Sequence, residues 1–317
     1  MRAAATCLVE TKAGRESPEE KGSRLAFEVA GVRVAMNCPA GGPALELPAA
    51  HKGFEARDTQ TGVEISVHWA EEIPEPRGGV VFDSGGVWRL YRHGDGWEFC
   101  FRSPAWGAAP YKTARMDASF ARGEVWLSRR VFGERASVYP LEYPLDELLV
   151  IHRLSRGGGV EVHGCGVVDE RGRGLLFTGH SGAGKSTLAR LWAEPGCAQI
   201  LSDDRIILRR EVDGTGRGRI VMHGTPWHGE GRFSLPMAAP LTAVYVLEHA
   251  KRGNEIERLE PMAATAELMS RCFLPFHDAG GLEFALQFLA GVAAEAPCSA
   301  FRFVPDASAV REIGNRE

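Results

Sequence analysis

The first 140 residues carry short runs in which hydrophobic and polar positions alternate, a pattern typical of β-strands. The candidate strands are 25–36, 63–69, 80–82, 87–92, 97–102 and 125–128. The glycine-rich turn Gly94-Asp95-Gly96 separates two of these runs and predicts a hairpin. No helical spacing of useful length precedes residue 140, so this half is predicted to be β-rich.

After residue 140 the pattern changes, and apolar positions at helical spacing alternate with strand-like runs. A helix is predicted at 145–155, ending at the glycines 157–159. Strands are expected at 159–168, 175–178, 199–209, 219–223, 242–247 and 300–304. Helices are expected after residue 184 to about 192, and at 261–273, 279–294 and 306–313. This alternation is typical of an α/β domain.

These patterns predict two domains with separate cores, 1–140 and 141–317, joined by the proline-containing segment 139–145. The first twenty or so residues turn charged quickly and lack a long apolar core, so they are predicted to form a flexible tail.

Composition narrows the class of protein. The net charge of −4 argues against general binding to nucleic acid or to an anionic membrane. No apolar run approaches the roughly 18 residues that span a bilayer. The seven cysteines form no CxxC pair, which favours free thiols and a cytoplasmic protein. The oligomeric state stays open.

The stretch LLFTGHSGAGKSTLARLW contains the pattern Gly-x-x-x-x-Gly-Lys-Ser/Thr between a predicted strand and a predicted helix. Amides of such a loop cradle phosphates, the lysine reaches the β- and γ-phosphates, and the serine hydroxyl binds Mg²⁺. Only six of the 37 basic residues are lysines. A phosphate-binding loop needs a point charge on a slim side chain, which an arginine cannot provide, and this explains the lysine at position 185. The predicted ATP-binding residues are Gly179, His180, Ser181, Gly182, Ala183, Gly184, Lys185, Ser186 and Thr187. The alternative is a glycine-rich turn without a ligand.

A pair of acids, Asp203 and Asp204, lies between apolar strand segments shortly after this loop. In a phosphoryl-transfer site one carboxylate can hold Mg²⁺ and the other can accept the proton of an attacking hydroxyl. Neighbouring strand residues point to opposite faces, so both serve one centre only if the chain bends there. The alternative is a solvated bend.

Two further residues are candidates for the same chemistry. His163 could polarise a phosphate oxygen or orient a carboxylate, or it could be a hydrogen-bonded core histidine. Arg232 ends a glycine-rich loop, 223–232, and could neutralise charge in the transition state, or it could be a surface arginine.

The order of VEVHGCGVV, LLFTGHSGAGKSTLARLW and ILSDDRIIL resembles the catalytic core of HPr kinase/phosphorylase, which shares its P-loop fold with ATP-type phosphoenolpyruvate carboxykinases. The whole segment 140–317 is similar to HPr-kinase-related proteins, which include kinases acting on a serine of ribosomal peptide precursors. The resemblance implies phosphate and Mg²⁺ binding by Lys185 and Ser186. It also implies that Asp203 activates the acceptor hydroxyl and that Asp204 is its metal-associated partner, with His163 as the active-site histidine.

This resemblance has limits that bear on the substrate. Thr187 stands where HPr kinases usually carry glutamate, and the downstream Glu-x-Arg-Gly signature is missing from the sequence. Both departures argue against HPr itself as the acceptor. The expected fold is therefore a C-terminal α/β P-loop domain of the HPr kinase/carboxykinase type with a β-rich N-terminal domain. The expected function is a Mg²⁺- and ATP-dependent kinase that phosphorylates a hydroxyl, with serine of a protein or peptide as acceptor. A small-molecule kinase and a nucleotide-sensing binding module are the alternatives.

Overall fold

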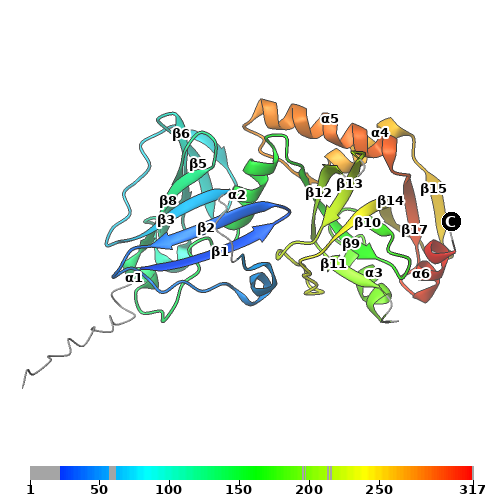
Figure 1. Cartoon of the computed structure of the whole chain (residues 1–317), viewed down its shortest axis with the longest axis horizontal. Helices are drawn as coiled ribbons and strands as arrows, with labels where there is room; N and C mark the ends of the chain where they lie inside the picture. The colour runs from blue at the N-terminus through cyan, green and yellow to red at the C-terminus, as the bar shows by residue number, and fades with distance from the viewer. Residues whose placement is uncertain are drawn as a thin grey trace, which may run out of the picture.

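The chain folds into two large β-sheets with a small number of helices (Figure 1). The computed structural model describes residues 22–56, 62–194, 196, 198–212, 214 and 216–315. The tail expected at residues 1–20 lies outside the described residues. The prediction of a mixed α/β protein is confirmed at this level, and strands predominate throughout.

The first sheet contains eight strands in the order β1-β2-β3-β8-β7-β6-β5-β4. Their bounds are β1 Ser23–Val29, β2 Val32–Cys38, β3 Val63–Ala70, β4 Val80–Asp83, β5 Trp88–His93, β6 Gly96–Phe101, β7 Lys112–Met116 and β8 Arg122–Ser128. The short helices η2 Ala49–Phe54, η3 Pro104–Trp106 and α1 Arg129–Phe132 lie in or after its connections.

Two features of this sheet differ from the prediction. The strand expected at 25–36 is a hairpin, because Ala30 and Gly31 have φ of 49° and 72° and reverse the chain between β1 and β2. The sequence pattern does not predict β7, because Lys112 and Arg115 interrupt its apolar positions. Lys112 is nevertheless buried, with its ammonium 4.5 Å from the centre of the Phe101 ring.

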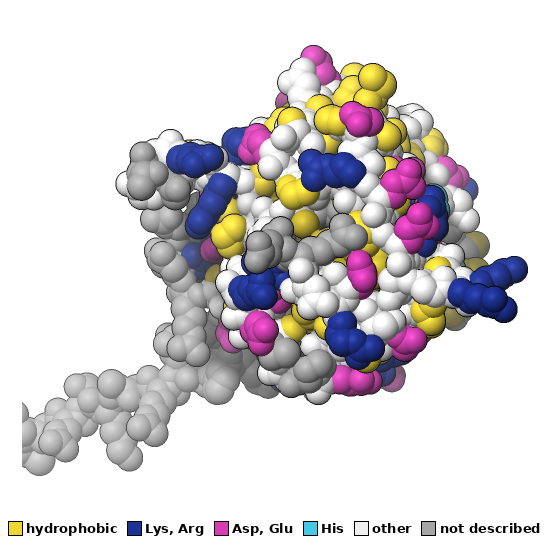
Figure 2. Space-filling view, turned by 90° about the vertical axis from the view of Figure 1, so that its right-hand side faces the viewer, with side chains coloured by type: hydrophobic (Ala, Val, Ile, Leu, Met, Phe, Trp, Pro, Cys, Tyr) yellow, Lys and Arg dark blue, Asp and Glu magenta, His cyan; other side chains and the backbone are white. Residues whose placement is uncertain are grey.

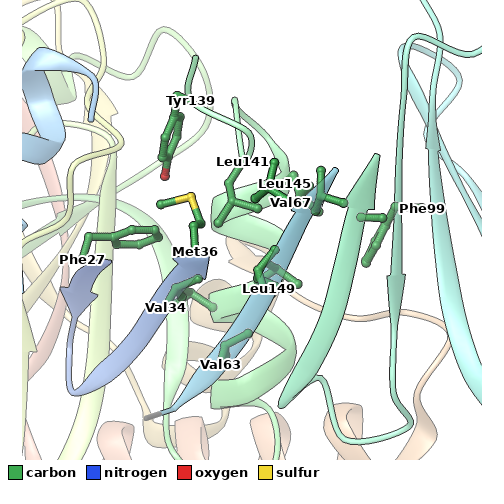
Figure 3. Packing of buried hydrophobic residues seen from close by; sticks show 14 of the residues in the cluster. Phe27, Val34, Met36, Val63, Val67, Phe99, Tyr139, Leu141, Leu145 and Leu149 are labelled. Carbon is green, nitrogen blue, oxygen red and sulfur yellow. The ribbon is translucent and has the colours of Figure 1, made fainter. Parts of the chain in front are cut away.

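Helix α2, Leu145–Leu154, packs against the first sheet. Figure 3 shows Leu145 and Leu149 beside Val34, Met36 and Val67 from the strands, and these side chains are fully buried. The boundary expected after residue 140 separates the two sheets but leaves α2 with the second, whereas its apolar face belongs to the first core. We call the first sheet with α2 the first unit and the rest of the described chain the second unit.

The second sheet contains nine strands in the main order β10-β9-β12-β13-β14-β17-β15, with β11 and β16 also paired to β9. Their bounds are β9 Val160–Val168, β10 Gly174–Thr178, β11 Gln199–Ser202, β12 Arg205–Val212, β13 Gly218–His223, β14 Ala238–His249, β15 Glu255–Arg258, β16 Cys272–Phe273 and β17 Cys298–Phe303. Strand β14 runs parallel to both β10 and β17, whereas the other pairings are antiparallel.

Four helices accompany this sheet: α3 Lys185–Ala193, α4 Pro261–Met269, α5 Ala279–Glu295 and α6 Ala307–Gly314. Alternate strand residues face two different cores. Leu176 packs in a cluster with α4 and α5, while its neighbours Leu175 and Phe177 pack with α3 and α6. Figure 1 shows these helix pairs on opposite sides of the strands.

In the second unit, one predicted strand and one predicted helix are each replaced by two elements. The strand expected at 199–209 is split into β11 and β12 at Asp203-Asp204, which supplies the bend that the acid pair requires. The helix expected at 261–273 ends at Met269, because Cys272 and Phe273 pair with β9 as strand β16.

Figure 2 shows the end of the second unit, where basic and acidic side chains are interspersed. Arg302 on β17 contributes to such pairing through contacts with Glu248, Glu255 and Glu257 on the adjacent strands. Exposed pairs of this kind stabilise a fold little, so the two buried clusters of this unit contribute more to its stability. Within the described residues, no helix is both long enough and apolar enough to span a membrane.

Candidate active site

The glycine-rich loop 179–184 connects β10 to α3. Gly182 and Gly184 have φ of 80° and 98°, a region that other L-residues rarely adopt. A Cβ at Gly184 would lie 2.7 Å from Phe303 Cζ, so this position also has no room for a side chain. The loop ends at the amino terminus of α3, where the helix dipole favours an anion.

Lys185 is held inside this loop and is 6% exposed. Its Nζ donates to the carbonyl oxygens of Gly179 at 2.9 Å and His180 at 3.1 Å. Burial lowers the pKa of Lys185, and the nearby charge of Asp204 opposes that effect. A bound anion would favour the charged ammonium further, as expected of a phosphate-binding lysine.

Asp203 is 1% exposed and accepts four hydrogen bonds. Its Oδ2 accepts from the Ser186 hydroxyl at 3.0 Å and the Gly231 N–H at 2.8 Å. Its Oδ1 accepts from the N–H groups of Gly229 at 3.0 Å and Phe233 at 3.3 Å. The carboxylate therefore fixes the Ser186 hydroxyl and the loop 229–233 together.

Asp204 points elsewhere and lines a cleft beside the glycine-rich loop. Its Oδ1 lies 2.9 Å from His163 Nε2, and its Oδ2 accepts from the Arg205 guanidinium. Burial alone would raise the pKa of Asp204, but the hydrogen bond from His163 and the charge of Arg205 lower it. Asp204 is therefore an ionised carboxylate at neutral pH.

Arg205 connects this carboxylate to the first unit. Its Nε donates to Glu147 Oε1 of α2 at 2.6 Å and lies 3.5 Å from Glu161 Oε1. Its Cζ lies 4.0 Å from the centre of the Phe273 ring. Burial, followed by the negative charge of Glu147, raises the pKa of Glu161 well above its usual range.

The cleft has a volume of about 400 Å³. Its lining residues are His163, Ser181, Gly182, Gly184, Lys185, Ser186, Thr187, Asp204, Gly229 and Glu230. It thus brings together the predicted loop, Ser186, His163 and Asp204.

Besides Asp203, four of the predicted residues do not line this cleft. Gly179 and Ala183 belong to the loop but are buried, and His180 is exposed with its carbonyl oxygen accepting from Lys185. Arg232 is also exposed and has a φ of 58°, an uncommon value for a residue other than glycine. Its neighbours Gly229 and Glu230 reach the cleft, but its own side chain does not.

The oxygen atoms at the cleft suit a Mg²⁺ ion brought in with phosphates. Among the described residues there is no group of three or more His, Cys, Asp or Glu side chains that could form a complete metal site. Mg²⁺ commonly takes one or two protein oxygens and completes its coordination with substrate phosphates and water. The Ser186 hydroxyl and the Asp204 carboxylate are oxygens of this kind at the cleft.

Several residues with a part in this arrangement were missed by sequence reasoning. Gly229 and Gly231 are required beside Asp203, because a Cβ on either would lie 2.9 Å or 2.7 Å from its Oδ2. The two glycines in the loop were a visible signal. His249 on β14 contacts the glycine-rich loop 179–184, with its Nε2 2.7 Å from the Gly182 carbonyl oxygen. Nothing in the local sequence marks that contact.

A comparison with protein-family models finds no match, and a search of curated proteins finds no sequence that is significantly similar to this chain.

Proposed function

We propose that this protein is a Mg²⁺- and ATP-dependent kinase that transfers a phosphoryl group to a hydroxyl, with serine of a protein or peptide as the acceptor. One observation carries the proposal: the Lys185 loop and the His163–Asp204 pair line the same cleft. The first is suited to binding phosphates and the second to binding a hydroxyl. We further propose that the second unit is a P-loop domain of the HPr kinase/carboxykinase type.

The nucleotide side of the cleft would consist of the loop 181–184 with Lys185, Ser186 and Thr187. Loop amides and the amino end of α3 would bind phosphate oxygens, and the Lys185 ammonium would neutralise their charge. Mg²⁺, when bound with the nucleotide, would withdraw charge from the phosphates. The Ser186 oxygen is a candidate ligand for that ion, since its hydroxyl hydrogen is donated to Asp203.

The acceptor side would consist of Asp204 and His163. The geometry favours Asp204 for the role toward the acceptor hydroxyl that the resemblance implies for Asp203. Asp203 accepts four hydrogen bonds within the fold and is 1% exposed, whereas the Asp204 side chain is 26% exposed at the cleft. Asp204 would orient the acceptor hydroxyl, and the His163–Asp204 pair would take its proton.

Arg232 keeps its proposed role only if its side chain turns into the cleft when the nucleotide binds, since its loop already contributes Gly229 and Glu230 there. A cytoplasmic location fits the proposal, because ATP is abundant there and the five cysteines of the described residues are free thiols.

Calorimetric titration with Mg·ATP tests the nucleotide side first. Lys185→Ala should abolish binding or weaken it strongly, because the charge that meets the β- and γ-phosphates is lost. Lys251→Ala removes an exposed lysine outside the cleft and should bind as the wild type does. Lack of Mg·ATP binding by the wild type would contradict the proposal. Incubation with labelled ATP and lysate of the source organism then identifies the acceptor.

A further inference from the structure

A second cavity lies where the two units meet, and it has a volume of about 340 Å³. The first unit contributes β4, β5 and α2, and the second contributes the segment 272–277, which leads into α5. Figure 1 shows the amino end of α5 close to α2, between the two sheets. Boundaries between units are common positions for ligand sites, and this volume is at the small end of their range.

The lining of this cavity is apolar and uncharged. It includes Phe82, Trp88, Leu148, Ile151, Leu274 and Phe276, and it contains no carboxylate, ammonium or guanidinium. Burial lowers the pKa of His152 to about 3, so this lining residue is neutral at physiological pH. Burial also raises the pKa of Cys272, which keeps its thiol protonated. A charged group would lose its hydration here without compensation, so the cavity selects an apolar one.

Phe273 links the cavity to the candidate active site. The same side chain lines the cavity, lies 4.0 Å from Arg205 Cζ, and has its ring centre 6.0 Å from that of His163. Since His163 and Arg205 both bind Asp204, a single aromatic ring separates the apolar cavity from the groups that hold the proposed base.

The rim of the cavity is also apolar and is exposed to solvent. Phe276, which lines the cavity, is 64% exposed. Two nearby residues of the chain that do not line it are also exposed: Val80, the first residue of β4, at 55%, and Val87, just before β5, at 45%. Strand β4 is the last strand of the first sheet, so its outer edge has no partner in the described residues. An apolar edge strand beside an apolar pocket is suited to an extended peptide, which pairs with the edge and places a side chain in the pocket.

We propose that this cavity binds a bulky apolar side chain of the acceptor, carried by an extended peptide segment that lies along β4. The inference rests on the proposed kinase function for the identity of that peptide as the acceptor. It gives the first unit a definite part in substrate choice, because β4, β5 and α2 form one wall of the pocket.

The geometry also limits where the apolar residue lies relative to the phosphorylated serine. The Phe273 and His163 ring centres are 6.0 Å apart, and the occupant would lie about as far again from Phe273. An extended chain advances about 3.3 Å per residue, so roughly two to four residues separate the apolar side chain from the serine.

Binding of synthetic peptides tests the inference and does not require the natural acceptor. The probes are fluorescein-labelled nonapeptides with a central serine in a glycine–glutamine background. One set carries a single phenylalanine at each other position in turn, and a matched set carries aspartate there. We expect phenylalanine two to four residues from the serine, on one side, to bind at least about tenfold more tightly than aspartate, as burial of an aromatic side chain implies. Absence of any such preference in the wild type would overturn the inference.

Surface variants locate the binding site. Phe276→Asp should remove the preference for phenylalanine, and Phe276→Leu should retain it. Leu286→Asp makes the same change of polarity at a half-exposed position on α5 outside the cavity, so it should also retain the preference. A preference that survives Phe276→Asp would show that the peptide binds elsewhere. If the wild type is a dimer by light scattering and Phe276→Asp is a monomer, the face is a contact between copies and the inference is overturned.

Failure of this inference is distinguishable from failure of the kinase proposal. Lys185→Ala should leave peptide anisotropy unchanged, because the ammonium lies on the nucleotide side. A wild type that binds phenylalanine peptides but not Mg·ATP would support the cavity and contradict the kinase. A wild type that binds Mg·ATP without preference among peptides would contradict the cavity alone.

Discussion

The two adjacent acids have different surroundings, and a matched pair of substitutions separates their roles. Asp203→Asn removes an acceptor from a carboxylate that takes four hydrogen bonds inside the fold. Asp204→Asn changes a partly exposed carboxylate at the cleft. We expect the first to lower stability and the second to lower turnover.

The size of the first effect follows from the hydrogen bonds. An asparagine at position 203 keeps one oxygen, and its amide is best placed toward Ser186, whose hydroxyl can rotate to accept from it. The Gly231 N–H then has no acceptor, which costs about 1–3 kcal/mol, and the remaining bonds lose their charge assistance. Since Gly231 is only partly buried, we expect a loss of about 2 kcal/mol, which lowers the melting temperature by roughly 4–8 °C.

Asp204→Asn should change the melting temperature by less than half of that amount, because its carboxylate keeps contact with solvent and the pair with His163 is screened. Its turnover should fall by about 10²–10⁴, the usual range for loss of a general base. Thermal melts in parallel with an assay of ADP release measure both quantities on the same preparations.

Three outcomes would refute this reasoning. A wild-type melting temperature for Asp203→Asn would show that its hydrogen bonds contribute no net stability. Wild-type turnover for Asp204→Asn would remove the proposed base. Turnover of Asp204→Asn that recovers at high Mg²⁺ concentration would return Asp204 to the role of a metal ligand, as the sequence resemblance implies.

Further predictions concern charge and strain at single positions. Arg232→Gly relieves a φ of 58° and should raise stability by up to about 1 kcal/mol, while turnover falls by about 10³-fold or more if the guanidinium neutralises transition-state charge. The control Ala30→Gly, at a φ of 49°, should raise stability in the same way without lowering turnover. Equal turnover of Arg232→Gly and Ala30→Gly would show that Arg232 is a surface residue without a part in catalysis. The pKa of His152 is about 3 in the fold against 6.5 for the free side chain, so its contribution to stability is complete above pH 6.5 and is lost as the pH falls toward 3. At pH 5.5 urea titration should show a loss of about 1 kcal/mol, and this loss should be missing from His152→Phe.

The strands with regular alternation could be predicted from sequence, and those with charged residues could not. Strand β7 could not be predicted, because the burial of Lys112 depends on the Phe101 ring and on the Glu142 carbonyl oxygen, which come from other segments. Helix α2 illustrates a different limit. Its apolar spacing predicts one buried face, but periodicity carries no information about which sheet covers that face, and the first sheet does so.

The candidate site likewise has a part that could be predicted from sequence and a part that could not. The glycine-rich loop could be predicted because its lysine, its glycines and the following helix are all local. The roles of the two acids could not, because the partners of Asp203 come from residues 229–233 and the partner of Asp204 is His163. Spacing along the chain gives no means of deciding which acid reaches the cleft.

The contacts of Arg205 indicate that the second unit does not complete its site alone. Its guanidinium holds Asp204 at one end, and its Nε donates to Glu147, which is 5% exposed on α2 of the first unit. Removal of one partner from a buried pair costs about 3–5 kcal/mol, because the other charge is left uncompensated. A chain lacking the first unit would therefore hold Arg205 and Asp204 in altered positions, even with its phosphate-binding loop intact. Since α2 also forms a wall of the apolar cavity, the first unit contributes both to the placement of the proposed base and to the proposed choice of acceptor.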